Sequence, residues 1–272
     1  LEISFKEEKM SNSWLFRRTH RVKGRKRLID QSNSGLKFLR YGRIIITGGK
    51  PPIAFDTKDE EVGLICLQGE GRVEVNGERF GMKKYDALYL PRQTSARVTS
   101  SETFDLAECA APVSRKYNVQ FVSFAEVLKN PKLVNRAGFE PYARTIHTLI
   151  GEANVQAGRI LAGVTMSREG NWTSWPPHDH SAAKEEIYLY TDMPAPNFAI
   201  HLNYWNFKKP EIVAMVQDGD AVAIKKGYHY NVAAPGTVTT FVWMMAAIQE
   251  EKDRVFTTVT VQPEFDGKFK LF

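Results

Sequence analysis

From residue 36 onward, apolar and polar residues alternate over short segments that end at glycine, proline, asparagine or aspartate. A period of two places side chains on opposite faces of a β-strand, and turn residues end each strand. Asn76-Gly77 is the sequence typical of a tight β-hairpin. In the first half, the pattern predicts strands at residues 42–46, 62–67, 72–75, 87–90 and 96–100. This regular spacing favours a sandwich or barrel over a parallel sheet with helices.

The second half of the chain repeats this pattern after a break. A short helix is predicted at residues 124–128, and the polar, turn-rich segment after it is typical of a linker. Strands then resume at residues 145–150, 159–166, 186–190, 198–204, 212–216, 221–224 and 239–245. We therefore expect an all-β protein with two related barrels in tandem. The expected units are an N-terminal basic arm or edge strand (1–34), a first barrel (35–128), a linker (129–143) and a second barrel (144–272).

Positive charge is concentrated near the N-terminus. The formal net charge is +6, but residues 1–30 hold nine basic and four acidic side chains, whereas residues 31–272 hold 28 and 27. The basic stretch at residues 17–27 has few aromatic residues and no amphipathic period, so we interpret it as a solvated arm or edge strand. We therefore expect no nucleic-acid partner, and we expect the nearly neutral body to bind a single small carboxylate.

The sequence shows no membrane or disulfide signal. No apolar run approaches the roughly 20 residues that span a bilayer, and no charged start leads into an apolar signal segment. Met10 followed by Ser-Asn-Ser resembles a translation start, so we interpret residues 1–9 as an upstream extension. Cys66 and Cys109 each lie in an apolar stretch and make neither a disulfide framework nor a zinc motif. We expect two buried thiols in a cytoplasmic protein without a membrane partner.

Three of the six histidines fall in a pattern that suits a metal ion. His178 and His180 are two residues apart and therefore share one face of a strand or extended segment. Glu186 lies at the start of the next predicted strand, and His229 follows a glycine turn much later. Three imidazoles and a carboxylate suit a divalent transition metal and leave positions for substrate oxygens. Each signal alone is common, and it is their combination within a predicted barrel that favours a metal site.

The residues around these histidines resemble a known family. A His-x-His pair with a following glutamate and a third histidine after a glycine is similar to the two motifs of the cupin superfamily. The resemblance is closer to the 5-deoxy-glucuronate isomerases of inositol catabolism. It is carried by Gly170-Asn171-Trp172-Thr173-Ser174-Trp175-Pro176-Pro177-His178-Asp179-His180, Glu185-Glu186-Ile187-Tyr188-Leu189-Tyr190, Gly227-Tyr228-His229 and Ala233-Ala234-Pro235-Gly236. The segments 64–71, 87–90, 144–146 and 241–246 are similar to the related 5-keto-4-deoxyuronate isomerase of pectin breakdown.

The resemblance covers residues 36–255 and implies a bicupin, that is, two tandem double-stranded β-helices of the jelly-roll type. It implies one divalent metal in the second barrel, with zinc favoured and manganese, iron or nickel as alternatives. Its implied ligands are His178, His180, Glu186 and His229. The neighbouring Glu185 remains an alternative ligand, because a shift of one residue moves a strand side chain to the other face. The first barrel has no histidine at the equivalent place, and we interpret it as structural.

The resemblance also implies an aldose–ketose isomerisation that converts 5-deoxy-glucuronate to 2-deoxy-5-keto-gluconate. Such a reaction moves a proton between adjacent carbons, and it needs stabilisation of an enediolate and a positioned base. The candidate catalytic residues are Glu186, His201 and Tyr188, with Glu185 and Tyr190 as alternatives. A substrate carboxylate requires a basic side chain. The candidate substrate-binding residues are Arg144, Lys184, Tyr228 and Trp243.

Two departures from the inositol family leave the substrate open. His201 stands in the segment where that family has Gln-Arg before a tyrosine, and Tyr230 stands where it has a proline. The pectin-pathway sugar acid is therefore the alternative substrate. A non-catalytic sugar-acid-binding cupin and a metal cupin with oxygen chemistry are the alternatives from other classes. In each case we expect a homo-oligomer.

Overall fold

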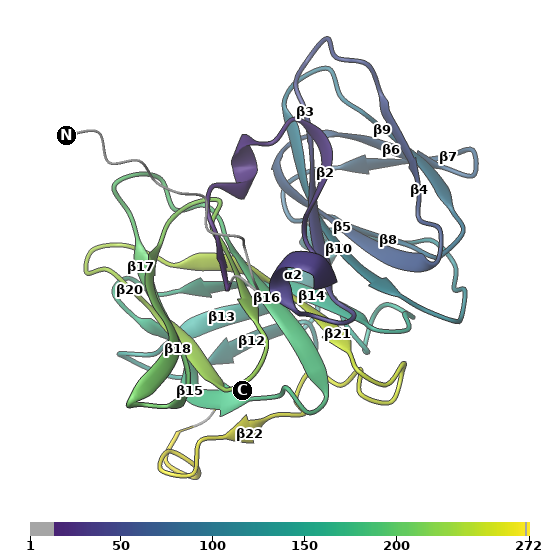
Figure 1. Ribbon diagram of the computed structural model, residues 1–272. Coiled ribbons are helices and arrows are strands. Elements are labelled where there is room, and N and C mark those ends of the chain that lie inside the picture. The colour runs from purple at the N-terminus through teal and green to yellow at the C-terminus, as the bar shows by residue number, and fades with distance from the viewer. Residues whose placement is uncertain (1–13, 270) are drawn as a thin grey trace, which may run out of the picture.

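The computed structural model describes residues 14–269 and 271–272, which form two barrels of antiparallel β-sheets (Figure 1). The larger sheet of the first barrel contains, in spatial order, β11 (Gln120–Val122), β8 (Ala87–Leu90), β5 (Glu60–Gly69), β10 (Phe104–Pro112), β3 (Arg40–Ile46) and β2 (Gly24–Ile29). Its smaller sheet contains β4 (Ile53–Asp56), β9 (Ser95–Thr99), β6 (Gly71–Val75) and β7 (Glu78–Met82). The interpretation of residues 1–9 concerns a segment outside the described residues.

The second barrel has the same two-sheet construction. Its larger sheet contains β1 (Leu15–Phe16), β19 (Ala221–Ile224), β16 (Lys184–Tyr190), β21 (Thr240–Ala247), β14 (Ile160–Ser167), β13 (Arg144–Ile150) and β12 (Val134–Ala137). Its smaller sheet contains β18 (Lys209–Val216), β17 (Ala199–Asn206), β20 (Tyr228–Ala233), β15 (Trp172–Asp179) and β22 (Thr260–Val261). The expected all-β bicupin fold is confirmed.

Helices are few and short in the described part of the chain. They are α1 (Gln31–Ser34), α2 (Phe124–Lys129) and the 3-10 helix η1 (Thr19–Arg21). Neither α-helix has the length or the apolar character that a bilayer crossing requires. The helix that the sequence predicted at residues 124–128 is present as α2 and is one residue longer.

Local turn chemistry explains the strand boundaries that the sequence predicted. Asn76 and Gly77 join β6 to β7, and both have positive φ angles (52° and 85°), as a type I′ hairpin requires. The central strand β10 was not predicted, because Asp105 and Glu108 interrupt its apolar residues; the fold buries both carboxylates in ion pairs with Arg43 and Arg25. Residues 134–137, expected in a linker, form β12 and pair with β13, so the second barrel's sheet begins before residue 144.

The N-terminal segment connects the two barrels. β1 pairs with β19 of the second barrel, whereas β2 pairs with β3 of the first. Arg25 and Arg27 on β2 form ion pairs with Glu108, which is 1% exposed. The interpretation of this stretch as a solvated arm is therefore wrong for these two side chains, although both strands lie at sheet edges as the alternative interpretation expected.

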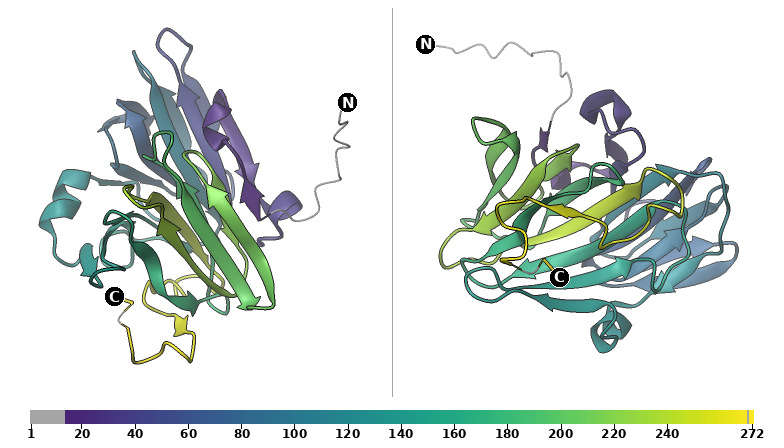
Figure 2. Two further views of the ribbon diagram at one scale, coloured as in Figure 1. Left: turned by 90° about the vertical axis from the view of Figure 1, so that its left-hand side faces the viewer. Right: turned by 90° about the horizontal axis from the view of Figure 1, so that it is seen from below.

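The larger sheets of the two barrels pack against each other. One hydrophobic cluster includes Ile65 and Cys109 from the first barrel together with Ile187 and Met244 from the second. Cys66 and Cys109 are both fully buried, as the sequence predicted, and burial raises the pKa of the Cys66 thiol to about 12. Figure 2 shows the two barrels from two further sides, with the C-terminal segment crossing the second barrel.

Candidate metal centre

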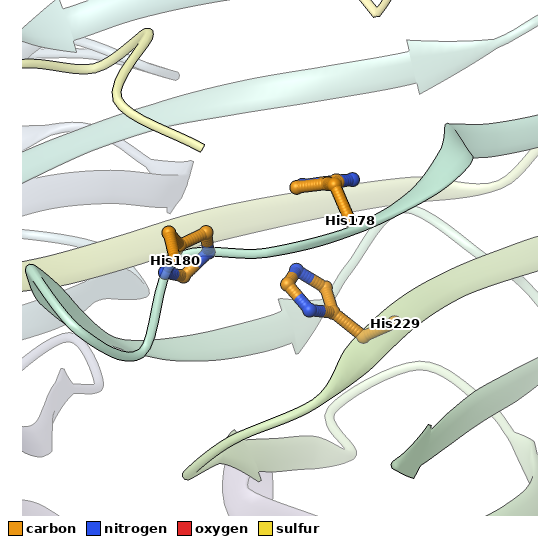
Figure 3. Close-up of side chains that lie close together, drawn as sticks. All are labelled: His178, His180 and His229. Atoms are coloured by element: carbon orange, nitrogen blue, oxygen red, sulfur yellow. The ribbon is translucent and has the colours of Figure 1, made fainter. Parts of the chain in front are cut away.

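Neighbouring strands of the second barrel bring the three predicted histidines together. His178 lies on β15 and pairs across the sheet with His229 on β20, and their ring centroids are 4.6 Å apart. His180 follows directly after β15. Figure 3 shows the three rings gathered in one place. Their potential ligand atoms all lie within 4.8 Å of one another, and this is the one cluster of three or more such residues among those described.

Backbone carbonyls fix the tautomer of each ring. Nδ1 of His178 lies 3.0 Å from the carbonyl oxygen of Pro176. Nδ1 of His180 lies 3.2 Å from that of Lys184, and Nδ1 of His229 lies 3.2 Å from that of Gly227. Because a carbonyl oxygen only accepts, each Nδ1 must carry the proton, which leaves the Nε2 lone pair free for a metal.

Glu186 on β16 completes the group. Its Oε2 lies 3.0 Å from Nε2 of His180 and 3.0 Å from Nε2 of His229. A carboxylate oxygen this close to two ring nitrogens requires positive charge between them, either protons on the two rings or a metal ion. Ligand atoms bonded at about 2.1 Å to one ion lie about 3.0 to 3.4 Å apart, so the spacing fits a shared metal. The residues present can therefore hold a metal ion.

Burial and charge tune the protonation states of this group. Burial acts to raise the pKa of Glu186, but in the absence of a metal the positive charge and hydrogen bonds of protonated His180 and His229 lower it to about 2, and a bound ion would supply that positive charge in their place. Burial, together with the neighbouring His229 and His180, holds the pKa of His178 well below its usual value. An ionised carboxylate beside neutral His178 is the state in which both bind a metal best.

The two adjacent glutamates have different partners. Both oxygens of Glu185 accept backbone N–H groups at 2.7–2.9 Å, from Lys37, Phe38 and Leu39 in the segment before β3. Its carboxylate therefore joins the two barrels and is turned away from the histidines, as strand alternation requires. Of the two glutamates, Glu186 is the one that lies in the metal centre.

The side chain of Asp179 holds together the two segments that carry the histidines. Asp179, between His178 and His180, accepts the backbone N–H of Gly227 through Oδ1 at 2.9 Å. This bond ties the turn that carries His229 to the end of β15. The sequence reasoning missed this role, although the position within His-x-His offered a signal for it.

A small cavity adjoins the metal centre, and several predicted site residues line it. Its lining includes His178, His180, Glu186, Tyr188, Arg144 and Trp243, together with Ser174, Thr165, Phe241 and Met245. The hydroxyl of Tyr188 lies 2.8 Å from Oγ of Ser174, a residue that the sequence reasoning missed. Burial raises the pKa of Tyr188 well above its usual value, so the hydroxyl stays protonated.

Apart from His229, three predicted site residues do not line this cavity. The ammonium group of Lys184 donates to the carbonyls of Val255 and Thr258 at 2.7 and 2.8 Å, so it anchors the chain after β21. Tyr228 stacks on the exposed Trp205 instead, with ring planes 5° apart. The ring of His201 packs edge-on against that of Tyr188, with centroids 5.8 Å apart. Its Nδ1 lies 2.7 Å from the hydroxyl of Tyr190, and burial lowers the pKa of His201 to about 3.

Comparisons with known proteins agree with this arrangement. A model of the KduI/IolB family matches residues 16–262. The chain is 25% identical over 235 residues to a 5-deoxy-glucuronate isomerase from Geobacillus thermodenitrificans, covering 80% of this chain and 83% of that one. It is 26% identical over 227 residues to a 4-deoxy-L-threo-5-hexosulose-uronate ketol-isomerase from Halalkalibacterium halodurans, covering 77% and 80%. The crystal structure of an IolB-like protein from Salmonella typhimurium LT2 overlays with a TM-score of 0.80 at 22% identity, covering 93% of this chain and 97% of that one.

Fold and site together define a bicupin whose second barrel carries a three-histidine, one-glutamate centre next to a cavity with a buried arginine. The chain belongs to the KduI/IolB family. It is an isomerase of this family, and the resemblance inferred from the sequence is confirmed.

Proposed function

We propose that this protein is a metal-dependent aldose–ketose isomerase that converts 5-deoxy-glucuronate to 2-deoxy-5-keto-gluconate. The observation that carries the proposal is the convergence of three histidine Nε2 lone pairs and the Glu186 carboxylate beside a cavity that also holds Arg144. A sugar acid has oxygens for the metal at its carbonyl end and a carboxylate for the arginine. The similarity to the Geobacillus 5-deoxy-glucuronate isomerase supports this substrate.

The reaction moves one proton between adjacent carbons of the sugar acid. A bound divalent metal supplies Lewis-acid stabilisation of the negative charge on the enediolate oxygens. Oε2 of Glu186 faces the histidines, which leaves Oε1 as the atom that would accept the carbon-bound proton and return it to the neighbouring carbon. The protonated hydroxyl of Tyr188 can donate to a substrate oxygen. Phe241 and Met245 in the cavity wall exclude water from the intermediate.

The donor set suits several metals. Three imidazoles and a carboxylate match zinc, which we favour, and they also suit manganese, iron and nickel. In each case His178, His180, His229 and Glu186 would hold the ion.

The second candidate is the ketol-isomerisation of 4-deoxy-L-threo-5-hexosulose-uronate. The Halalkalibacterium relative with this name is 26% identical to the chain, compared with 25% for the Geobacillus relative. Both reactions are ketol isomerisations of a deoxy sugar acid, so the same residues serve either one.

The test is to measure the metal content of the purified protein and then to incubate it with each sugar acid. We expect about one divalent ion per chain, and conversion of 5-deoxy-glucuronate that stops on chelation and returns on adding the metal. Conversion of only the hexosulose-uronate would favour the second candidate. Oxygen uptake, or binding of a sugar acid without conversion, would contradict isomerase activity.

A matched pair of variants tests the metal ligands. Glu186→Gln removes the charge from the centre, so we expect metal affinity to fall about 10- to 100-fold and kcat by at least that factor. Glu185→Gln keeps the centre and weakens the bonds to residues 37–39, so we expect normal metal content and a lower melting temperature. Metal affinity that is unchanged in Glu186→Gln would contradict the assignment.

A further inference from the structure

Arg144 is a buried cation without a carboxylate partner. It is 3% exposed, and no ion pair joins it to an acidic side chain in the described residues. Its Nη1 donates to the carbonyl of Tyr142 at 3.1 Å, and its buried Nε has no hydrogen-bond partner. A buried charge that lacks a counterion is strongly destabilising unless a ligand neutralises it. The surroundings of Arg144 therefore match the binding site of an anion.

The remaining donor of Arg144, Nη2, binds the carbonyl oxygen of Leu271. Leu271 belongs to a group of four residues that follow β21 and line the cavity. We call these residues the C-terminal cap: Phe256, Val259, Leu271 and Phe272. Phe256 stacks on Trp243 with ring centroids 4.7 Å apart, and Phe272 lies against Phe256 at 5.1 Å. The indole N–H of Trp243 is buried and has no hydrogen-bond partner.

With the cap in place, the cavity is too small for a sugar acid. Its free volume is about 40 Å³, whereas ligand pockets commonly measure about 300–1,000 Å³. The residues of the cap are held unequally. Phe256 and Val259 are held through their chain neighbours Val255 and Thr258, whose carbonyls accept hydrogen bonds from Lys184. The main-chain carbonyl of Leu271, by contrast, is held by the same guanidinium that a substrate carboxylate needs.

We propose that the guanidinium of Arg144 forms a carboxylate subsite, and that the Leu271 carbonyl occupies it until an entering sugar acid displaces Leu271 and Phe272. The carbonyl oxygen takes the place of one carboxylate oxygen, and the unpartnered Nε of Arg144 is a donor left for the other. The proposal rests on the proposed function only for the identity of the sugar acid.

Displacement of the cap gives two measurable consequences. The apparent affinity for a sugar acid is reduced by the fraction of molecules in which the subsite is closed. A variant that weakens the cap must therefore bind the anion more tightly. In addition, hydrogen exchange in the peptide that contains Leu271 and Phe272 must speed up when the anion binds.

The experiment uses gluconate, which has the carboxylate but no carbonyl to isomerise, and glucitol, which lacks the carboxylate. Calorimetry on Phe272→Ala is expected to show gluconate binding about fivefold tighter than in the wild type, because the open fraction rises. Arg144→Gln is expected to bind gluconate at least about tenfold more weakly. Phe265→Ala is the matched control, because Phe265 lies in the same part of the chain but packs on Trp175. Its gluconate affinity is expected to equal that of the wild type.

Hydrogen exchange provides a measurement that does not depend on any variant. Gluconate is expected to speed exchange of the peptide with Leu271 and Phe272 in the wild-type protein, and glucitol is expected to leave it unchanged. Slower exchange with gluconate, equal gluconate affinity in Phe272→Ala, or full affinity in Arg144→Gln would each overturn the proposal. Because gluconate is not isomerised, these outcomes are separate from the conversion assays that test the proposed function.

Discussion

At the scale of single residues, hydrogen-bond partners divide four histidines of the second barrel into two roles. His178, His180 and His229 each place Nδ1 on a backbone carbonyl and keep Nε2 for a ligand. His201 instead places Nδ1 on the hydroxyl of Tyr190, and its buried Nε2 has no hydrogen-bond partner. Histidines of one barrel therefore form a candidate metal centre in one case and pack in the barrel interior in the other.

His201 also predicts a pH dependence of stability. Burial lowers its pKa to about 3, so the folded protein keeps this ring neutral where the unfolded chain, with a pKa near 6.5, takes up a proton. The unfolded state binds more protons in this range, so stability is lost as the pH falls below about 6.5. Between pH 7 and pH 5 this one group removes about 2 kcal/mol from the free energy of unfolding.

The measurement compares urea unfolding of the wild type and His201→Gln at pH 7 and pH 5. We expect the variant to lose about 2 kcal/mol less than the wild type over this interval. Contributions from the other histidines are common to both proteins and cancel in the difference. Equal losses in the two proteins would show that His201 is not held neutral by the fold.

At the scale of elements, the N-terminal strand β2 supplies partly exposed arginines that neutralise a buried carboxylate of the first barrel. Arg25 on β2 reaches across β3 to Glu108 on β10, with Nε and Oε2 2.7 Å apart, and packs over the ring of Phe55. Glu108 is almost fully buried, so it depends on Arg25 and Arg27 for its counter-charge. The basic residues of this strand are therefore part of the first barrel's packing.

Arg25→Ala is predicted to destabilise the protein by about 1–2 kcal/mol, because Arg27 remains to compensate part of the buried charge. Arg79→Ala is the control, since Arg79 and Glu74 form an exposed pair that is expected to contribute under about 0.5 kcal/mol. Thermal or urea unfolding of both variants measures the difference. Equal effects would mean that Glu108 does not need its partner on β2.

At the scale of the whole molecule, a shared core and two carboxylates join the barrels. Glu61 of the first barrel accepts the backbone N–H groups of Gly158, Arg159 and Ile160 in the second. Glu185 of the second barrel accepts those of Lys37, Phe38 and Leu39. Each barrel thus satisfies buried backbone donors of the other, and separating them would leave those donors and carboxylates exposed.

We therefore predict that the two barrels unfold together. Calorimetry of the metal-free protein should show one transition, with a calorimetric enthalpy close to the van't Hoff enthalpy. The physical reason is that the hydrophobic cluster between the larger sheets is incomplete without residues from both barrels. Two resolved transitions, or a stable and soluble fragment of residues 129–272, would contradict this prediction.

Local periodicity and turn chemistry let the sequence determine most of the fold. Alternation located most of the strands, Asn76-Gly77 located a hairpin, and the spacing of His178 and His180 placed both rings on one face. These features depend on neighbouring residues only, so a sequence carries them directly. The strand β10 was missed because Asp105 and Glu108 interrupt its apolar residues, and only the fold supplies the arginines that allow both carboxylates to be buried.

Only the tertiary structure decided which of these side chains meet. The sequence could not choose between Glu185 and Glu186, because alternation separates the two faces of a strand without saying which face holds the histidines. It also gave no sign that Lys184 would anchor Val255 and Thr258, or that the carbonyl of Leu271 would reach Arg144. These contacts join residues more than 70 positions apart, and they arise from the packing of whole strands, which no local pattern records.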